Sequence, residues 1–368
     1  MLLFFLLVNV CWGQFPDIPE KHLPTLKTIP SPAEIILEVR GKSAKVKGVE
    51  IGIFNLTDGS ESTWDIPPQI LTPVIRQEPY SSAQRSSWAS QTGQLLLSLV
   101  DVIYLINRDG SYSEVHFKMP GHLDPYNGMS TYALTKDAKF VAYSLYTRDR
   151  NDKQEDKAGR LYLDLMYQKL EGSTPISIAK GSDKYMPDWS PDGTKIAFRT
   201  TIEQTFIASD NKTVSKVESA KKLVIADISG QVIASIDPQT KKMPLAFEAA
   251  IDEIRWDPSG NRLAFLYYGK LYLVNADGSD FRPIEFKEID KESRILSFAW
   301  SPSGKQVVFR STYEAREICN YNFIYRFEVG RFPCRQGYHL FTSNIDGSNV
   351  KKLTDDPDYR GSQLFWIQ

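Results

Sequence analysis

Residues Trp256 to Ser279 read WDPSGNRLAFLYYGKLYLVNADGS, and this stretch predicts three short strands joined by tight turns. Leu263–Leu266 and Leu271–Val274 alternate apolar and aromatic side chains over strand-length runs. Turn-forming residues bound each run, because proline presets φ, glycine accepts a positive φ, and Asn or Asp side chains bond to the nearby backbone. The stretch therefore predicts one antiparallel sheet unit.

The unit recurs along the chain, as two alternating markers show. The first marker is an anchor residue ahead of an apolar strand core, at Trp88, Leu134, Trp189, Trp256, Trp300 and Trp366. The second marker is a glycine turn after an apolar strand, at Gly59, Gly110, Gly172, Gly230, Gly278 and Gly347. The markers alternate without a break from Gly59 to Trp366. Six units result, and one of them is shared between the two ends of the chain.

The length of the unit predicts the architecture. Four strands in about 40–45 residues is the size of a β-propeller blade, and Trp256 lies 44 residues before Trp300. We predict an all-β fold, a six-bladed propeller of four-stranded antiparallel blades over residues 33–368. Its ring is expected to close by pairing Gln363–Ile367, as an inner strand, with outer strands at Ala33–Val39, Val49–Asn55 and Thr63–Ile66.

Three copies of the unit resemble a known family. WSPDGTKIAF, WDPSGNRLAF and WSPSGKQVVF, which begin at Trp189, Trp256 and Trp300, look like the repeats of TolB-type β-propellers. The resemblance covers roughly residues 33–368. The family's periplasmic member carries a separate α/β domain ahead of its propeller, whereas only a short tail precedes the first strand here. The resemblance implies a stand-alone propeller with a partner docking over a loop-rich face or the mouth of the central channel.

The first residues predict export. Met1–Val10 is an apolar run too short to span a bilayer. Small residues ahead of Gln14 favour cleavage of a signal peptide of residues 1–13, and a lipid anchor at Cys11 is the alternative. Residues 14–32 are rich in proline, without periodicity, and predict a tail. The mature protein is therefore expected to be secreted or periplasmic, without a membrane span.

Charge limits the classes of partner. The net charge is −1 and no basic run is present, so neither nucleic acid nor an anionic membrane is expected as the main partner. The sequence predicts a monomer that binds a protein or peptide.

Two cysteines remain outside the leader. Cys319 and Cys334 bracket a predicted hairpin in the fifth unit, and an even pair in an exported chain favours a disulfide. Two independent buried thiols are the alternative. Asn55 and Asn211 match the N-glycosylation pattern, which matters only if the source is eukaryotic.

Loop lengths distinguish the two faces of the predicted propeller. Turns after the first and third strands of each unit are short. The long insertions 145–159, 200–222 and 311–336 follow second strands, and the long connections between blades lie on the same face. Because function concentrates on loops carried by a rigid scaffold, this loop face is the predicted binding surface.

The candidate partner-binding residues belong to these loops. They are mostly aromatic or cationic, as interface anchors are: His122, Asp124, Tyr126, Tyr146, Arg148, Tyr185, Tyr313 and Arg316.

Three further patterns are expected to be structural. The anchor tryptophans are expected to pack between neighbouring sheets, with ligand stacking as the alternative. The turn aspartates are expected to cap turns, because no loop groups several carboxylates as a calcium site does. His116 and His122 flank one loop, and a metal or acid–base site there would need ligands from other blades. We predict no cofactor and no metal.

These observations predict an exported, non-catalytic binding scaffold. The competing hypothesis is a metal-dependent lyase or hydrolase acting on oligosaccharides, since TolB-like propellers also resemble lyases with histidines and a divalent metal at the channel mouth. That chemistry needs a histidine cluster, and this chain has only 4 histidines. Nucleophile-elbow, zinc-helix and P-loop patterns are also lacking in the sequence.

Overall fold

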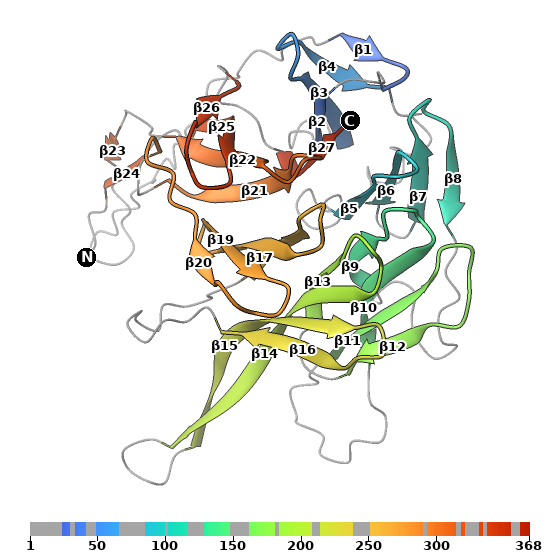
Figure 1. The fold of residues 1–368 in the computed structure, drawn as a ribbon, viewed down its shortest axis with the longest axis vertical. Coiled ribbons are helices and arrows are strands. Elements are labelled where there is room, and N and C mark those ends of the chain that lie inside the picture. Colours follow the sequence, from blue (N-terminus) through green and yellow to red (C-terminus); the bar gives the residue numbers. More distant parts are fainter. Residues whose placement is uncertain are drawn as a thin grey trace, which may run out of the picture.

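The computed structural model shows a ring of β-sheets around a central axis (Figure 1). Among the described residues every regular element is a strand, and they contain no helix long and apolar enough to cross a membrane. The residues described are 24–29, 34–41, 49–65, 85–99, 102–115, 129–147, 162–180, 184–207, 214–237, 251–289, 293–313, 318–320, 331–333, 337–354 and 361–368.

Five blades follow one another along the chain, each a four-stranded sheet. Blade 1 contains β5 (Arg85–Ala89), β6 (Gln94–Leu99), β7 (Val102–Asn107) and β8 (Tyr112–Val115). Blade 2 contains β9 (Met129–Leu134), β10 (Phe140–Thr147), β11 (Tyr162–Lys169) and β12 (Ile176–Ala179). Blade 3 contains β13 (Lys184–Trp189), β14 (Lys195–Ile207), β15 (Val214–Asp227) and β16 (Val232–Ile236).

Blade 4 contains β17 (Ile251–Trp256), β18 (Arg262–Tyr267), β19 (Lys270–Asn275) and β20 (Arg282–Pro283). Blade 5 contains β21 (Ile295–Trp300), β22 (Gln306–Tyr313), β25 (Gly337–Asn344) and β26 (Lys351–Lys352). The sixth sheet, the closing blade, contains β1 (Thr25–Leu26), β2 (Ile35–Gly41), β3 (Val49–Asn55), β4 (Glu61–Trp64) and β27 (Gly361–Ile367). The predicted six-bladed propeller is confirmed.

The turns explain why glycine recurs at fixed positions. Tyr268 and Gly269 both have positive φ, 53° and 69°, which is the geometry of a two-residue hairpin turn. Gly230 has a φ of 89° and also lies against the preceding blade. A Cβ built there would approach the carbonyl oxygen of Ile178 to 2.4 Å. Glycine is therefore required at this turn by backbone conformation and by blade packing together.

The hydrophobic core lies between neighbouring blades. Ala197, Leu223 and Ile225 of blade 3 form one buried cluster with Trp256 and Phe265 of blade 4. Each fully buried side chain of this kind contributes about 1.5–3 kcal/mol by removing apolar surface from water. The core is therefore divided among the contacts between blades.

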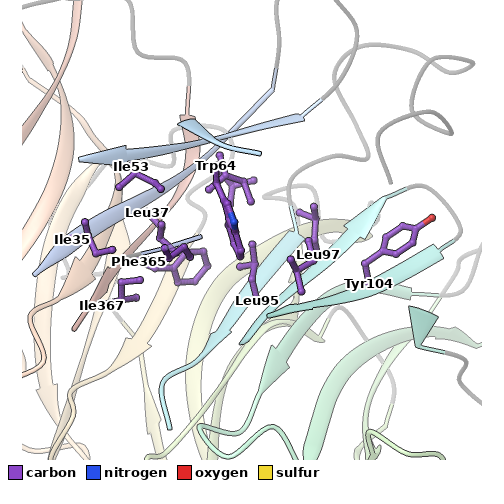
Figure 2. Close-up of a cluster of buried hydrophobic side chains, with 13 residues drawn as sticks. Ile35, Leu37, Ile53, Trp64, Leu95, Leu97, Tyr104, Phe365 and Ile367 are labelled. Atoms are coloured by element: carbon purple, nitrogen blue, oxygen red, sulfur yellow. The ribbon is translucent and has the colours of Figure 1, made fainter. Parts of the chain in front are cut away.

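The ring closes through the two ends of the chain. β27 pairs antiparallel with β2, placing Leu37 opposite Phe365 and Ile35 opposite Ile367. Figure 2 shows these four side chains in a cluster with Leu95 of blade 1 and its neighbours. The predicted closure is confirmed, although β4 spans Glu61–Trp64 and not Thr63–Ile66. The turn after β3 is tight, since the Asn55 N–H donates to the Ser60 carbonyl, so pairing resumes at once.

One predicted loop is wrong. Residues 200–222 were expected as a long loop inserted between the second and third strands, but β14 and β15 remain paired from Lys195 opposite Asp227 to Ile207 opposite Val214. The segment is rich in Thr, Val and Ile, which favour strands. Figure 1 shows this hairpin projecting beyond the ring.

Within the predicted tail, Thr25 and Leu26 form β1, which pairs in parallel with β4. The closing blade therefore has a fifth strand that the sequence did not predict.

A small separate sheet lies within the insertion of blade 5. β23 (Ile318–Asn320) pairs antiparallel with β24 (Arg331–Pro333), and Cys319 is opposite Phe332. Cys334 lies outside the described residues, so the disulfide stays a prediction.

Candidate functional site

The inner strands around the centre of the ring are β27, β5, β9, β13, β17 and β21 (Figure 1). On one edge of each inner strand the described structure has no further strand, so the backbone N–H groups on that free edge need other acceptors. Side chains of the preceding blade supply them at five successive junctions. The acceptors and donors are Gln363 Oε1 with Ser86 N (2.6 Å), Ser87 Oγ with Leu134 N (2.9 Å), Thr131 Oγ1 with Met186 N (3.1 Å), Asp188 Oδ2 with Trp256 N (2.7 Å) and Glu253 Oε2 with Phe298 N (3.0 Å).

The anchor tryptophans of blades 3, 4 and 5 are structural, as predicted. Trp189, Trp256 and Trp300 are only 6%, 6% and 7% exposed. Each indole N–H donates, at 3.1 Å, to a backbone carbonyl of the preceding inner strand, that of Ala133, Asp188 or Arg255 respectively. Their side chains therefore join neighbouring blades and are not free to stack on a ligand.

A charged cluster lies on the inner strands of blades 3 and 4. Glu253 accepts two hydrogen bonds from the Arg255 guanidinium, at 2.9 and 3.2 Å. Burial raises the pKa of Asp188 to about 6, although Arg255 and the Trp256 N–H act in the opposite direction. Burial also raises the pKa of Glu253, again opposed by Arg255. Burial therefore makes both carboxyl groups harder to ionise than exposed ones.

Arg255 also reaches the closing blade. Its guanidinium carbon lies 5.2 Å from the ring centroid of Phe365 on β27, a distance at which a cation is attracted to an aromatic face. Since β21 lies between β17 and β27 in the ring, Arg255 links inner strands that are not neighbours.

On the short-turn face, the pKa values of the turn aspartates are lowered and not raised. In the turn after β13, partial burial acts to raise the pKa of Asp192, but hydrogen bonds from Ser190 and Thr194 lower it to about 2. In the turn after β19, hydrogen bonds from Ser279 hold the pKa of Asp277 below its usual value. These aspartates accept from their own turns, as predicted, and cap them.

Three of the predicted binding residues lie on described strands. Tyr146 is near the end of β10, Tyr185 is near the start of β13, and Tyr313 ends β22. An up-and-down blade brings the ends of second strands and the starts of first strands to one face, so the topology places these three positions on the loop face. His122, Asp124, Tyr126, Arg148 and Arg316 lie outside the described residues and stay predictions.

The histidines do not assemble a described site. His339 on β25 is 4% exposed, and its Nδ1 lies 2.9 Å from the Thr354 carbonyl oxygen. This hydrogen bond gives the buried ring a structural role. His116 and His122 lie outside the described residues. Within the described part of the chain, no group of three or more His, Cys, Asp or Glu side chains is placed to hold a metal ion.

Sequence reasoning missed the charged cluster. Its signal was present, because Asp188, Glu253 and Arg255 stand one to three positions before anchor tryptophans, where an inner strand is expected to be largely apolar. Charges at such positions are unusual unless they are paired.

The ring, its closure and its interblade core define a six-bladed β-propeller. No family model and no curated protein sequence matches the chain. Among solved structures, a protein described as TolB from Agrobacterium tumefaciens is similar, with 18% identity and a TM-score of 0.50 over 91% of this chain and 98% of that one. TolB from Acinetobacter baumannii has 12% identity and a TM-score of 0.50, over 91% and 66%. A chain of a nidogen/laminin complex has 8% identity and a TM-score of 0.52, over 91% and 98%. The resemblance to TolB propellers is thereby confirmed for the fold.

Proposed function

We propose that this protein is an exported, non-catalytic scaffold that binds a protein or peptide over its loop face and the channel mouth. The supporting observation is that the long insertions occupy the same place in three blades, between the second and third strands. In blade 3 these two strands themselves extend as the β14–β15 hairpin, whereas residues 148–161 and the insertion containing β23 and β24 follow the second strands of blades 2 and 5. A rigid ring beneath such segments lowers the ordering cost of binding.

The chemistry of the strand ends fits a protein partner. Tyr146, Tyr185 and Tyr313 come from three different blades, and tyrosine is among the residues that dominate interface energies. One protein of similar fold was solved in the nidogen/laminin complex. Export rests on residues 1–13, and the mature protein would begin at Gln14.

Shortening the insertions tests this function. In one variant, Thr200 is joined to Lys222 by a Tyr-Gly turn like that of blade 4; in a second, Tyr313 is joined to Gly337 in the same way. A partner captured by the intact chain is identified and then titrated against each purified protein. We expect at least a tenfold loss of affinity in one or both shortened chains, with unfolding midpoints close to that of the intact chain.

Asn261→Arg, an exposed change on the short-turn face, is the matched control and should bind normally. Unchanged affinity in both shortened chains would contradict the proposal. Metal analysis separates it from the lyase hypothesis: a stoichiometric divalent ion that is lost with His122→Ala would support an enzyme.

A further inference from the structure

A short N-terminal segment, Pro24–Ile29, lies on the outer edge of the closing blade. Thr25 is opposite Thr63 and Leu26 is opposite Trp64 in a parallel pairing. The Thr63 N–H donates to the Pro24 carbonyl and the Asp65 N–H donates to the Leu26 carbonyl, both at 2.8 Å. The segment therefore pairs with a sheet edge as an added strand does.

The same segment continues onto blade 1. The Ile29 N–H donates to the Arg108 carbonyl at 2.9 Å. The Ile29 side chain is 4% exposed and belongs to the cluster that contains Trp64 of the closing blade and Leu95 of blade 1. Leu26 packs against this cluster too. Figure 2 shows Trp64 between side chains of the closing blade and those of blade 1, so the segment covers the seam between these blades.

The contacts divide into two kinds. Backbone hydrogen bonds hold the segment to the edge, while the side chains of Leu26 and Ile29, three residues apart, enter the apolar cluster. Thr25, Lys27 and Thr28 are exposed. This division is that of strand addition, in which the backbone supplies affinity and a few side chains supply specificity.

The occupied edge is short. The described parallel ladder covers two residues of β1 against the four residues of β4. A longer extended segment with the same pair of aliphatic side chains would therefore make more backbone bonds and compete for this edge.

We propose that the edge of β4 and the adjoining side of blade 1 form a strand-addition site for an extended segment of a partner protein. The segment runs parallel to β4 and carries two aliphatic side chains three residues apart. Pro24–Ile29 is its intramolecular occupant, which an incoming partner displaces. The site is built from the closing blade and blade 1, which carry none of the three long insertions, so it does not depend on the function proposed above.

The connection between β1 and β2 is long enough for Pro24–Ile29 to pair with β4 of its own chain. Ile29 precedes Ile35, the first residue of β2, by six residues, which reach about 20 Å when extended. β1 and β2 are three strand spacings apart in the sheet, about 14 Å. The connection is thus long enough without exchange between two copies.

The outer edge of blade 3 differs. Val232 and Ile233 on β16 are 58% and 43% exposed, and nothing in the described structure indicates what would cover them. That edge is a control for the experiment.

The test uses the full chain and a labelled peptide of residues 23–31, LPTLKTIPS. In the L26D/I29D variant, two charges replace the aliphatic side chains and vacate the edge. We expect the peptide to bind this variant at least tenfold more tightly than the unmodified chain, where the covalently attached segment competes at an effective concentration in the millimolar range. A peptide carrying Asp at positions 26 and 29 should not bind.

Control variants locate the binding of the peptide. If L26D/I29D does not fold, L26A/I29A provides the same comparison. Equal binding of the peptide to the unmodified chain and to L26D/I29D would overturn the proposal, and so would no binding to either. Adding V232D/I233D to L26D/I29D should leave peptide binding unchanged, and a loss of binding there would also overturn the proposal. A dimer that dissociates in L26D/I29D would overturn it in favour of exchange between copies. Peptide selection on the vacated chain should enrich aliphatic pairs three residues apart, and no enrichment would count against a partner. Shortened loop-face insertions should leave peptide binding unchanged.

Discussion

Blade 4 and the closing blade have the same arrangement of four antiparallel strands but are assembled differently. Blade 4 comes from one continuous stretch, Ile251 to Pro283, joined by tight turns. The closing blade takes β27 from the end of the chain and β2 to β4 from its beginning. Local contacts form a blade at little loop-closure cost, whereas ring closure requires pairing over the whole length of the chain. The comparison separates what makes a blade from what makes a ring.

The junctions of these two blades also differ in chemistry. Blade 4 is held to blade 3 by Asp188, which accepts from the Trp256 backbone with its carboxylate and from the Trp256 indole with its carbonyl. The closing blade is held to blade 1 by Gln363, a neutral amide, which accepts from Ser86. On its other side, toward blade 5, the closing blade carries Trp366, whose buried indole N–H has no hydrogen-bond partner among the described residues. The acceptor is therefore an ionisable carboxylate at one junction and a neutral amide at the other.

Removing the non-local pairing is expected to have the largest effect. Deletion of residues 364–368 removes four of the six residue pairs between β2 and β27 and takes Leu364 and Phe365 out of the core. We expect loss of cooperative unfolding, measured by circular dichroism during thermal denaturation. Deletion of the exposed Gln368 alone is the control and should melt close to the intact chain. An intact-like transition in the longer deletion would contradict closure by β27.

The ionisable junction should make blade 4 sensitive to pH. The pKa of Asp188 rises on folding from 3.8 to about 6, so the native state binds this proton more tightly. Its contribution to stability is fully present below about pH 3.8 and is lost as pH rises through about 6. Between pH 4 and pH 7 the free energy of unfolding of Asp188→Asn should therefore rise by up to about 3 kcal/mol relative to that of the unmodified chain.

Urea unfolding at several pH values in this range measures that difference. Glu253 and Arg255, the charged groups beside Asp188, remain in both proteins. Gln363→Leu, at the neutral junction, should show a stability profile parallel to that of the unmodified chain. If the stability profile of Asp188→Asn were also parallel to that of the unmodified chain, the pKa of Asp188 would not change on folding.

A smaller effect should distinguish the two tryptophans. Trp256→Phe leaves the Asp188 carbonyl without its indole donor, whereas Trp366→Phe removes a buried N–H that has no described partner. Leaving a buried polar group unpaired costs about 1–3 kcal/mol. We expect the Trp256 variant to lose about 1–2 kcal/mol more than the Trp366 variant in chemical denaturation. Equal losses would show that packing alone sets the cost at both positions.

Much of the fold follows from local patterns, and the misses share a cause. The markers from Gly59 to Trp366 predicted the blades and their number, because each turn and strand is encoded within a few residues. Residues 200–222 were mistaken for a loop, since a long paired ribbon has no turn near its base to signal it. β1 was missed because two residues are too few to show a period, and only the edge of β4 makes them a strand.

The candidate site was predicted less completely. The sequence pointed to one face by its loop lengths, and Tyr146, Tyr185 and Tyr313 lie near strand ends of that face, while their role in binding stays a prediction. It did not bring together Asp188, Glu253 and Arg255, or place Arg255 against Phe365, which lies 110 residues away in the chain.

By itself the sequence determined the blade, its sixfold repetition and the sharing of one blade between the two ends, because periodic apolar strands and glycine turns act over short distances. Tertiary structure alone decided which side chains meet across blade junctions, which carboxylates are buried enough for their pKa to rise, and where a short N-terminal segment lies. These depend on the environment that the closed ring creates around each group, and no local pattern carries that information.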